Sequence, residues 1–255
     1  MARTVLITGG ARGISVATAQ LAATHGWDVA VIYREQAHAA DQAVAEVKSK
    51  GRNAMAIKAD IGRETDIIAA FHAVDNTMRP LGGLVNNAGT SAPNRVDALV
   101  ADELRCMFDV NVLGLMLCCR EAVKRMSTSN GGSGGHIVNV SSMAATIGGR
   151  PGASTYAASK GAVDVFTTGF AREVAAEGIR VNAVRPGATD TDMIADIRSG
   201  PRRAVVESTI PMGRYGRANE IAATIVWLLS DAAPFLTGAH INVGGGGFHV
   251  GAPIA

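Results

Sequence analysis

The feature that most restricts the fold is a regular alternation of short apolar runs with segments of helical spacing. Seven runs rich in β-branched residues recur along the chain, and each of the first six is followed by a segment in which apolar residues repeat every three or four positions. The runs are Thr4–Thr8, Val29–Tyr33, Asn53–Ala59, Gly83–Asn86, His136–Ser141, Arg180–Val184 and His240–Val243, and the helical segments are Ser15–His25, Ala37–Lys50, Glu64–Met78, Ala98–Met126, Tyr156–Glu177 and Asn219–Ser230. This pattern predicts a doubly wound α/β domain of about seven parallel strands, with right-handed crossovers and helices on both faces.

We expect residues 1–255 to form a single domain, because one core can still be filled at this length. Aromatic residues make up only 4% of the sequence, so Val, Ile, Leu and Ala must build that core. One segment, residues 192–211, is polar and interrupts the alternation late in the chain. It is either a flap over a binding site or an ordinary surface excursion.

Charge and cysteine content argue against several classes of protein. The net charge is only +2 and no basic run stands out, which argues against a nucleic-acid partner. Three cysteines, two of them adjacent, make a poor disulfide framework. The sequence begins without the layout of a signal peptide, and its apolar stretches are too short to span a bilayer. No pair of residues has metal-ligand spacing. We therefore expect a cytoplasmic protein with no membrane partner and no metal site.

A glycine-rich turn joins the first strand to the first helix, reading Thr8-Gly9-Gly10-Ala11-Arg12-Gly13-Ile14-Ser15. Glycines let backbone N–H groups approach a pyrophosphate, and the N-terminus of the helix adds the positive end of its dipole. Doubly wound sheets bind dinucleotides at this place. We therefore expect Gly9, Arg12, Gly13, Ile14 and Ser15 to contact a dinucleotide.

The end of the second strand indicates which dinucleotide is preferred. A carboxylate there would bind the ribose hydroxyls and repel a 2′-phosphate, whereas this strand ends in Tyr33-Arg34. The guanidinium groups of Arg34 and Arg12 can grip the 2′-phosphate by charge-assisted hydrogen bonds, which favours NADP(H). The alternative is that Arg34 is a solvated surface residue and that Glu35 binds the ribose of NAD(H).

Two further strand ends are candidate cofactor contacts. Asp60, with Ile61 after it, follows the third strand and can accept a hydrogen bond from an adenine amino group, cap a turn, or do both. The fourth strand ends in Asn86 and is followed by Asn87, Ala88 and Gly89, whose small size allows close approach of a cofactor. Part of this segment can also be structural, because asparagine amides bridge neighbouring strand ends.

Tyr156 and Lys160 are four residues apart, which places both side chains on one face of a helix. A free tyrosine has a pKa of about 10, too high for an efficient base near neutral pH. A neighbouring ammonium stabilises the phenolate, so we expect Lys160 to lower the pKa of Tyr156. The alternative is a core tyrosine beside a solvated lysine.

Two polar residues complete this candidate site. Ser142 follows the fifth strand, where its hydroxyl can bond a substrate oxygen as charge develops on it, while Ser141 should point to the other face. Asn111 lies inside an apolar helical run and needs partners if it is buried. It can hold a water that contacts Lys160, mark a distortion of the helix, or do both.

Together these residues resemble the short-chain dehydrogenase/reductase family, and the likeness runs from about Thr4 to Gly247. The matching positions are Thr8-Gly9, Asp60, Asn86-Asn87-Ala88-Gly89, Asn111, Ser142, Tyr156-x-x-x-Lys160, and Asn182-Ala-Val-Arg-Pro186-Gly187 with Thr189 and Thr191 after it. The resemblance implies a Rossmann-like domain and hydride transfer between a nicotinamide and a carbonyl/alcohol pair. It also implies that Tyr156 is the general acid/base, that Lys160 binds the nicotinamide ribose and that Ser142 positions the substrate oxygen.

The resemblance carries further roles. It implies that Asn111 anchors a proton-relay water, that Pro186, Gly187 and Thr191 hold the carboxamide side of the nicotinamide, with Thr189 beside them, and that the protein is a homotetramer. Two features depart from the pattern. Ser15 stands where the family has the last glycine of its turn, and we expect its hydroxyl to donate to phosphate. The spacing from Ser142 to Tyr156 is one residue longer than usual, which a loop at residues 148–152 can absorb.

The sequence therefore predicts an NADP-dependent oxidoreductase that interconverts a carbonyl and a secondary alcohol. A non-catalytic regulatory protein that binds NADP is the alternative from another class. Within the enzyme class, the resemblance also covers 3-oxoacyl-acyl-carrier reductases and sugar dehydrogenases. An acyl carrier would need a basic docking patch, for which Arg198, Arg202, Arg203 and Arg214 are candidates. Apolar residues in and beside the 192–211 segment favour a partly hydrophobic substrate.

Overall fold

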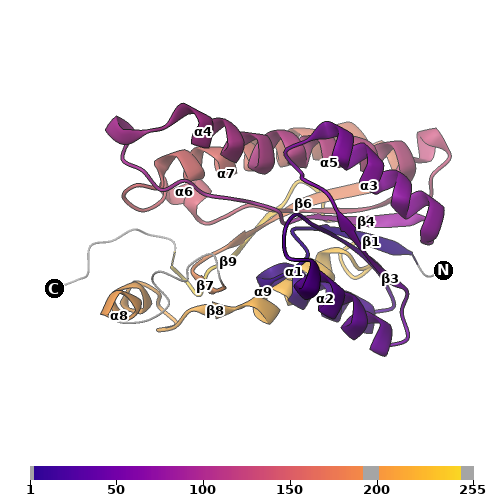
Figure 1. Ribbon diagram of the computed structural model, residues 1–255, viewed down its shortest axis with the longest axis horizontal. Helices are drawn as coiled ribbons and strands as arrows, with labels where there is room; N and C mark the ends of the chain where they lie inside the picture. Colours follow the sequence, from indigo (N-terminus) through magenta and orange to yellow (C-terminus); the bar gives the residue numbers. More distant parts are fainter. Residues whose placement is uncertain (1–2, 192–200, 248–255) are drawn as a thin grey trace.

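The computed structural model describes residues 3–191 and 201–247, and it has a parallel sheet between two layers of helices (Figure 1). The sheet has seven strands in the order β3 (Ala54–Lys58), β2 (Asp28–Tyr33), β1 (Thr4–Thr8), β4 (Leu81–Asn86), β5 (Gly135–Val140), β6 (Ile179–Pro186) and β9 (His240–Val243). The predicted fold class and all seven predicted strands are confirmed, with small differences at the strand ends.

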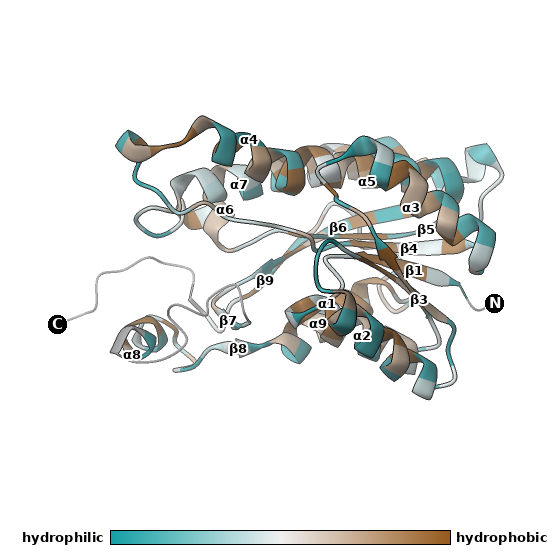
Figure 2. Cartoon of the chain, in the orientation of Figure 1, coloured by the Kyte–Doolittle hydropathy of each residue, from teal (hydrophilic) through white to brown (hydrophobic). Residues whose placement is uncertain are grey.

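The helices cover both faces of the sheet, as the alternation predicts. One layer contains α1 (Gly13–Thr24), α2 (Ala37–Ser49) and α9 (Ala218–Leu228), and the other contains α3 (Glu64–Thr77), α4 (Ala101–Phe108), α5 (Leu115–Met126) and α7 (Ser154–Val174) (Figure 1). The strands are apolar along their length because helices bury them on both sides. Figure 2 shows this as brown colour along the central strands and much teal on the outer faces of the helices.

Two apolar cores lie on opposite faces of the sheet, because successive side chains of a strand point in opposite directions. Leu6 of β1 packs with Phe71 of α3 in the first core. Its neighbours Val5 and Ile7 pack in the second core, with Ile225 of α9. These side chains are almost wholly buried, and aliphatic residues dominate both cores as the composition requires.

The strand order reverses direction between β1 and β4. The chain runs outward from β1 through β2 to β3, then returns to β4 and continues through β5 and β6 to β9. Open parallel sheets bind ligands at such a reversal, in the crevice outside the carboxyl ends of the strands. The fold therefore brings the ends of β1, β4, β5 and β6 to one edge, where the sequence places its candidate residues.

The predicted helix Ala98–Met126 is wrong as one regular element. Residues Val96–Ala98 form a short 3₁₀ turn, α4 begins at Ala101, and residues Asp109–Gly114 form a π-helix that joins α4 to α5. Among the two readings of Asn111, the predicted distortion of the helix is thus present in the structure. Apolar spacing alone does not reveal a widened turn, because the flanking helices keep the same faces buried.

Several short elements have no counterpart in the predicted pattern. They are α6 (Ala144–Ile147), α8 (Pro201–Ser208), the parallel pair β7 (Thr189–Asp190) and β8 (Gly216–Arg217), and 3₁₀ turns at Thr128–Asn130 and Ala175–Glu177. They are too short for a periodic pattern to reveal them. Within the predicted flap, residues 192–200 lie outside the described residues and the remainder includes α8.

Candidate active site

The backbone of the glycine turn after β1 lies so close to neighbouring segments that Gly9 and Gly13 leave no room for side chains. Gly9 and Gly13 have φ values of +72° and +57°, which L-residues rarely adopt. A Cβ on Gly9 would lie 3.0 Å from the Cα of Ala88, and one on Gly13 would lie 3.2 Å from Cγ2 of Thr191. The turn is therefore a narrow backbone cradle at the start of α1, with β4 and the end of β6 beside it. Arg12 is exposed in this turn, and Ile14 is partly buried.

Ser15 has a different role from the predicted contact with phosphate. Its side chain is completely buried, and its hydroxyl donates to the carbonyl of Thr8 at 3.2 Å. The same oxygen accepts a 2.6 Å hydrogen bond from Nδ2 of Asn87. The hydroxyl proton is thus used inside the protein, where it ties the first turn of α1 to the ends of β1 and β4.

The end of β4 is fastened to β1 by a second set of hydrogen bonds. The hydroxyl oxygen of Thr8 accepts from the backbone N–H of Asn87 at 3.1 Å and from that of Ala88 at 3.0 Å. Asn87, Ala88 and Gly89 are each partly exposed. The structural reading of this segment is therefore confirmed, and its contact with a cofactor stays a prediction.

Tyr156, Ser142 and Lys160 come together at the carboxyl end of β5. Nζ of Lys160 lies 5.9 Å from the centre of the Tyr156 ring, and the Tyr156 hydroxyl is hydrogen-bonded to Ser142. Ser141 points elsewhere, since its hydroxyl donates to the backbone carbonyl of Lys160 at 3.2 Å. The α7 helix and the end of β5 therefore assemble the predicted tyrosine, lysine and serine in one place.

The pKa of Tyr156 is shifted in the direction opposite to the prediction. Burial raises the pKa of Tyr156, and the hydrogen bond with Ser142 opposes that rise without reversing it. The predicted lowering by Lys160 is therefore wrong for the protein without cofactor. The phenol is protonated near neutral pH, which is the form that can donate a proton.

Lys160 is buried, with an exposed fraction of 3%, and its Nζ donates to the carbonyl of Val140 at 2.8 Å. Burial lowers the pKa of Lys160 to about 8, against an opposing effect of Asp164. A Cβ on Gly89 would stand 3.6 Å from this Nζ and 3.4 Å from Oδ1 of Asn111. Gly89 therefore lies directly beside the lysine ammonium and the Asn111 amide, and a side chain there would contact both.

Asn111 lies in the π-helix and is fully buried. Its Oδ1 accepts from the backbone N–H of Thr90 at 2.8 Å, and its Nδ2 donates to the carbonyl of Thr90 at 2.9 Å and to Oγ of Ser159 at 3.0 Å. The side-chain amide is therefore fully engaged in holding the segment after β4 against α7. A water that Asn111 anchors would have to bond its backbone.

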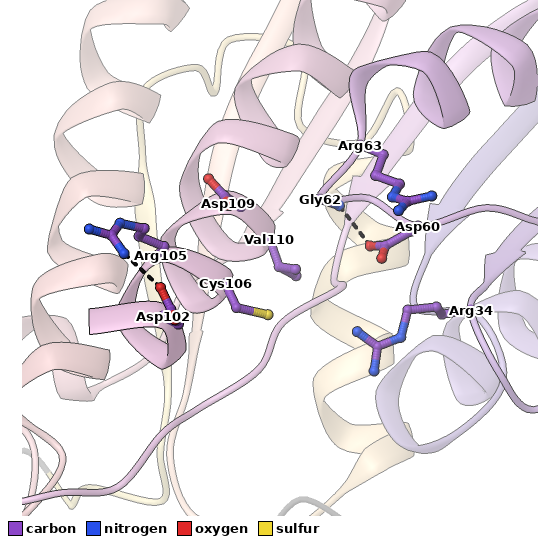
Figure 3. A pocket seen from close by; sticks show the side chains of 9 residues that line it. All are labelled: Arg34, Asp60, Gly62, Arg63, Asp102, Arg105, Cys106, Asp109 and Val110. Atoms are coloured by element: carbon purple, nitrogen blue, oxygen red, sulfur yellow. Dashed lines mark hydrogen bonds and ion pairs between the residues drawn. The ribbon is translucent and has the colours of Figure 1, made fainter. Parts of the chain in front are cut away.

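The far end of the crevice contains a pocket of about 270 Å³. Arg34 and Asp60 enter it from the ends of β2 and β3, while α4 and the π-helix supply the opposite wall (Figure 3). The lining residues are Arg34, Asp60, Gly62, Arg63, Asp102, Arg105, Cys106, Asp109 and Val110. Tyr33 is partly buried at the same strand end. A guanidinium and a carboxylate thus face one cavity at the place predicted for the adenosine half of the cofactor.

The individual contacts of this pocket answer two earlier alternatives in part. Arg34 is half-exposed and forms a 2.7 Å ion pair with Glu35. The residue considered for the 2′-phosphate and the one considered for the ribose of NAD(H) therefore lie together. Oδ1 of Asp60 accepts from the backbone N–H of Gly62 at 2.9 Å, which is the turn-capping role. Ile61, next to it, is buried against the π-helix.

Residues after β6 form the remaining wall of the crevice. The carbonyl of Pro186 accepts from the N–H of Met143, and the N–H of Gly187 donates to the carbonyl of Val243, each at 2.9 Å. The hydroxyl of Thr189 donates to the carbonyl of Gly187 at 3.0 Å. Between Ser142 and Tyr156 the chain forms α6 and a loop with three left-handed glycines: Gly148, Gly149 and Gly152.

Sequence reasoning missed the α4 wall of the pocket and a charged group behind Lys160. Arg63, Arg105 and Cys106 line the pocket, yet their spacing carries no motif. Asp164 is buried one turn beyond Lys160, and Arg185 contacts it. A polar residue four positions after Lys160 on the buried side of a helix was the available signal for this group.

The described part of the chain has no helix long and apolar enough to cross a membrane. Within the same residues, no group of three or more His, Cys, Asp or Glu side chains could hold a metal ion. All three cysteines are free, and Cys118 and Cys119 are buried in α5.

Comparison with known proteins gives consistent matches over nearly the whole chain. A family model described as Enoyl-(Acyl carrier protein) reductase matches residues 9–249. The chain is 49% identical over 242 residues to an uncharacterized oxidoreductase, YgfF, of Escherichia coli strain K12, covering 94% of this chain and 98% of that protein. It is 35% identical to the 3-oxoacyl-[acyl-carrier-protein] reductase of a Synechocystis strain, covering 96% of each.

A solved structure extends the likeness to three dimensions. The short chain dehydrogenase from Burkholderia cenocepacia J2315 in complex with NADP is 33% identical and superposes with a TM-score of 0.90, covering 96% of this chain and 97% of that one.

Proposed function

The chain is an oxidoreductase of the short-chain dehydrogenase/reductase family that acts on alcohol and carbonyl groups, and from this premise we propose that it uses NADP(H) with Tyr156 as general acid/base. The observation that carries the proposal is the meeting of three groups at the end of β5. The Tyr156 phenol bonds to Ser142, and the buried Lys160 ammonium lies 5.9 Å from the ring. The named activities of the relatives favour an enzyme over a non-catalytic NADP-binding regulator.

NADPH supplies the hydride when it is bound. In carbonyl reduction, Ser142 positions the substrate oxygen and Tyr156 donates a proton to it as negative charge develops there. The raised pKa of Tyr156 suits this direction, because the phenol holds its proton near neutral pH. Lys160 bonds the hydroxyls of the nicotinamide ribose, and its charge stabilises the phenolate that remains after proton transfer. In alcohol oxidation, Tyr156 removes the proton instead.

Several features of this chain fit the cofactor. The cradle at Gly9 and Gly13 puts backbone without side chains at the N-terminus of α1, where a pyrophosphate would bind, and Arg34 lines the pocket that would receive the adenosine half. From this position Arg34 would bond a 2′-phosphate, and Arg12, which is exposed in the glycine turn, would add a second guanidinium. That a relative of the same fold was solved with NADP supports the preference over NAD.

The remaining contacts follow from the same placement. Asp60 and Ile61 would border the adenine, Asn87, Ala88 and Gly89 the central part of the cofactor, and Pro186, Gly187, Thr189 and Thr191 its nicotinamide end. Asn111 would anchor the relay water through its backbone.

The experiment is a screen of carbonyl compounds with NADPH, following the loss of nicotinamide absorbance. We expect the wild-type protein to turn over at least one class of ketone or aldehyde, and Tyr156→Phe to bind NADPH with unchanged affinity but lose nearly all turnover. Tyr33→Phe, which removes a tyrosine hydroxyl at the adenosine end and away from the reacting carbonyl, is the control and should keep the wild-type kcat at saturating NADPH. Retained turnover in Tyr156→Phe would disprove the assigned role.

The substrate is a carbonyl compound, and the resemblance covers three classes of it: small ketones, acyl-carrier substrates and sugars. Two of the arginines considered for acyl-carrier docking are paired with acids: Arg203 with Glu207 at 2.9 Å and Arg214 with Glu220 at 2.7 Å. Paired guanidiniums attract an acidic carrier less strongly, so we favour a small ketone with apolar parts over an acyl-carrier substrate or a sugar. Arg198 lies outside the described residues.

We also propose that the protein is a homotetramer. Large apolar side chains are exposed on two separate faces, at Leu113 and Val165 over the π-helix and α7, and at Trp227 and Phe235 near α9. Two apolar faces on one chain suit the two interfaces of a tetramer. Light scattering after gel filtration tests this, and a monomer would contradict it. The three free cysteines support a reducing location such as the cytoplasm.

A further inference from the structure

A buried carboxylate lies one turn beyond Lys160 on the same helix. Asp164 has an exposed fraction of 8%, and its Oδ2 accepts a 2.8 Å hydrogen bond from Nε of Arg185 on β6. Its Oδ1 is buried and accepts no hydrogen bond from the described residues. Nε2 of His240 on β9 lies 3.8 Å from that oxygen and 3.0 Å from the backbone carbonyl of Asp164. The carboxylate is thus fixed in place with one oxygen incompletely paired.

Lys160 and Asp164 share a face of α7 because they are four residues apart. The Lys160 ammonium is buried against a neutral partner, the Val140 carbonyl. A buried ammonium loses its hydration, so a nearby negative charge is needed if it is to stay protonated. Burial lowers the pKa of Lys160 to about 8, and the charge of Asp164 acts in the opposite direction.

The groups around this pair are few in the part of the chain that the structure describes. Tyr156 faces Lys160 from α7, Arg185 faces Asp164 from β6, and His240 faces it from β9. Asn111 of the π-helix and Ser141 of the β5 end face the lysine side with neutral groups. Among the described residues named here, Asp164 is thus the carboxylate of this buried cluster, and it lies four residues from Lys160 on α7.

We propose that Asp164 is a positioning residue for the reaction: held by Arg185 and His240, its carboxylate keeps the Lys160 ammonium charged where it must bind the nicotinamide ribose and support Tyr156. The inference rests on the proposed function of Lys160. The competing interpretation is purely structural, with Asp164 serving only to tie α7 to β6 through Arg185. The two differ in pH dependence, because a structural tie has no reason to change the titration of Lys160.

Loss of the carboxylate would remove the anion that contacts Arg185 and lies one helical turn from Lys160. Arginine does not release its proton in proteins, so Lys160 is the cation that becomes easier to deprotonate. Its charged form is present below its pKa and is lost as the pH rises through it. Asp164→Asn should therefore move the alkaline limit of both NADPH binding and turnover to lower pH.

The test compares the pH dependence of the NADPH dissociation constant and of kcat for carbonyl reduction. For Asp164→Asn we expect the alkaline limb of both profiles to move down by about one pH unit, which corresponds to about 1.4 kcal/mol. Values at the acid end should stay close to wild type. Asp164→Glu keeps the charge and should return the limb toward its wild-type position. Glu173→Gln, an equal charge change at an exposed position of the same helix, should leave the profiles unchanged.

An unmoved alkaline limb in a folded Asp164→Asn protein would overturn the inference in favour of the structural tie. If that variant does not fold, Arg185→Met decides: removal of the guanidinium should move the limb upward, and an unchanged or lowered limb would overturn the proposal. Failure of the proposed function looks different, since the wild-type protein would then show no Tyr156-dependent turnover. The NADPH-binding profile still tests Asp164 in that case.

Discussion

Nδ2 of Asn87 donates a 2.6 Å hydrogen bond to the hydroxyl of Ser15, and this hydroxyl in turn donates to the carbonyl of Thr8. The bonds join the ends of β1 and β4 to the first turn of α1. Ser15 therefore strengthens the cradle from behind, and its buried oxygen does not face the crevice.

Ser15→Ala should accordingly lower stability more than cofactor affinity. The change leaves the Asn87 amide and the Thr8 carbonyl each without a buried partner, at a cost of roughly 1–3 kcal/mol. We expect that loss in urea unfolding, together with a nearly unchanged dissociation constant for NADPH by fluorescence titration. Val16→Ala, at the next and partly exposed position of α1, is the control. A large loss of NADPH affinity with unchanged stability would show that the hydroxyl reaches the cofactor after all.

Arg34→Ala should weaken NADPH much more than NADH. A hydrogen bond to a charged group contributes about 1.5–3 kcal/mol, so the dissociation constant for NADPH should rise by roughly 10- to 100-fold. The measurement is a titration of both nucleotides at one fixed salt concentration. Arg95→Ala removes another exposed guanidinium that pairs with an acid, Asp97, and should change neither affinity. Equal losses for the two nucleotides in Arg34→Ala would refute the NADP preference.

Gly114→Ala should destabilise the protein, although alanine favours helices. Gly114 ends the π-helix, and a Cβ there would lie 2.2 Å from the carbonyl oxygen of Ile61. The neighbouring backbone would have to shift, and such overpacking costs roughly 1–3 kcal/mol. The matched control is Gly169→Ala in α7, where a Cβ meets nothing within 4 Å and stability should rise by up to about 1 kcal/mol. Thermal or urea unfolding of both variants decides, and equal effects would contradict the steric account.

His136 should make stability depend on pH below neutrality. Burial lowers its pKa from 6.5 to about 4, so the folded protein binds a proton less readily than the unfolded chain does. The stability that the neutral imidazole provides is therefore full above about pH 6.5 and declines as the pH falls toward 4, by roughly 2–3 kcal/mol.

His136→Gln removes this titration, so its unfolding free energy should fall less between pH 6.5 and pH 4 than that of the wild type. Exposed His72→Gln is the control. Parallel pH curves for His136→Gln and wild type would contradict the assignment of the effect to His136.

The sheet was predictable from sequence because parallel strands are buried on both faces and therefore consist of consecutive apolar residues. Thr4–Thr8 and His240–Val243 are predicted to the residue, and the other strands differ only near their ends. The candidate site was also predictable as a set: Tyr156, Ser142, Lys160 and Asn111 occupy adjoining elements in the structure. The set could be predicted because the carboxyl ends of parallel strands meet at one edge of the sheet, whatever the conformation of the connecting loops.

Other features were beyond sequence reasoning because they depend on packing. The direction of the Tyr156 pKa is set by how deeply the phenol is buried, which spacing cannot tell. The partner that donates to the Ser15 hydroxyl oxygen is Asn87, which follows β4 and lies 72 positions away in the sequence. The α4 wall of the pocket, with Cys106 and Arg105, depends on the tilt of a helix whose own sequence is unremarkable in pattern.

The π-helix at Asp109–Gly114 has a consequence for how this chain can vary in length. A wide turn of this kind contains one residue more than an ordinary helical turn, so deleting a single residue there would restore regular geometry at almost no local cost. The same deletion would rotate everything on one side of it by about 100°. Asn111 would then swing away from Thr90 and Ser159 while the helix remained intact. Protein engineers who shorten this region would obtain a well-formed helix that has lost the contacts of Asn111, whereas the glycine loop at residues 148–152 should tolerate trimming.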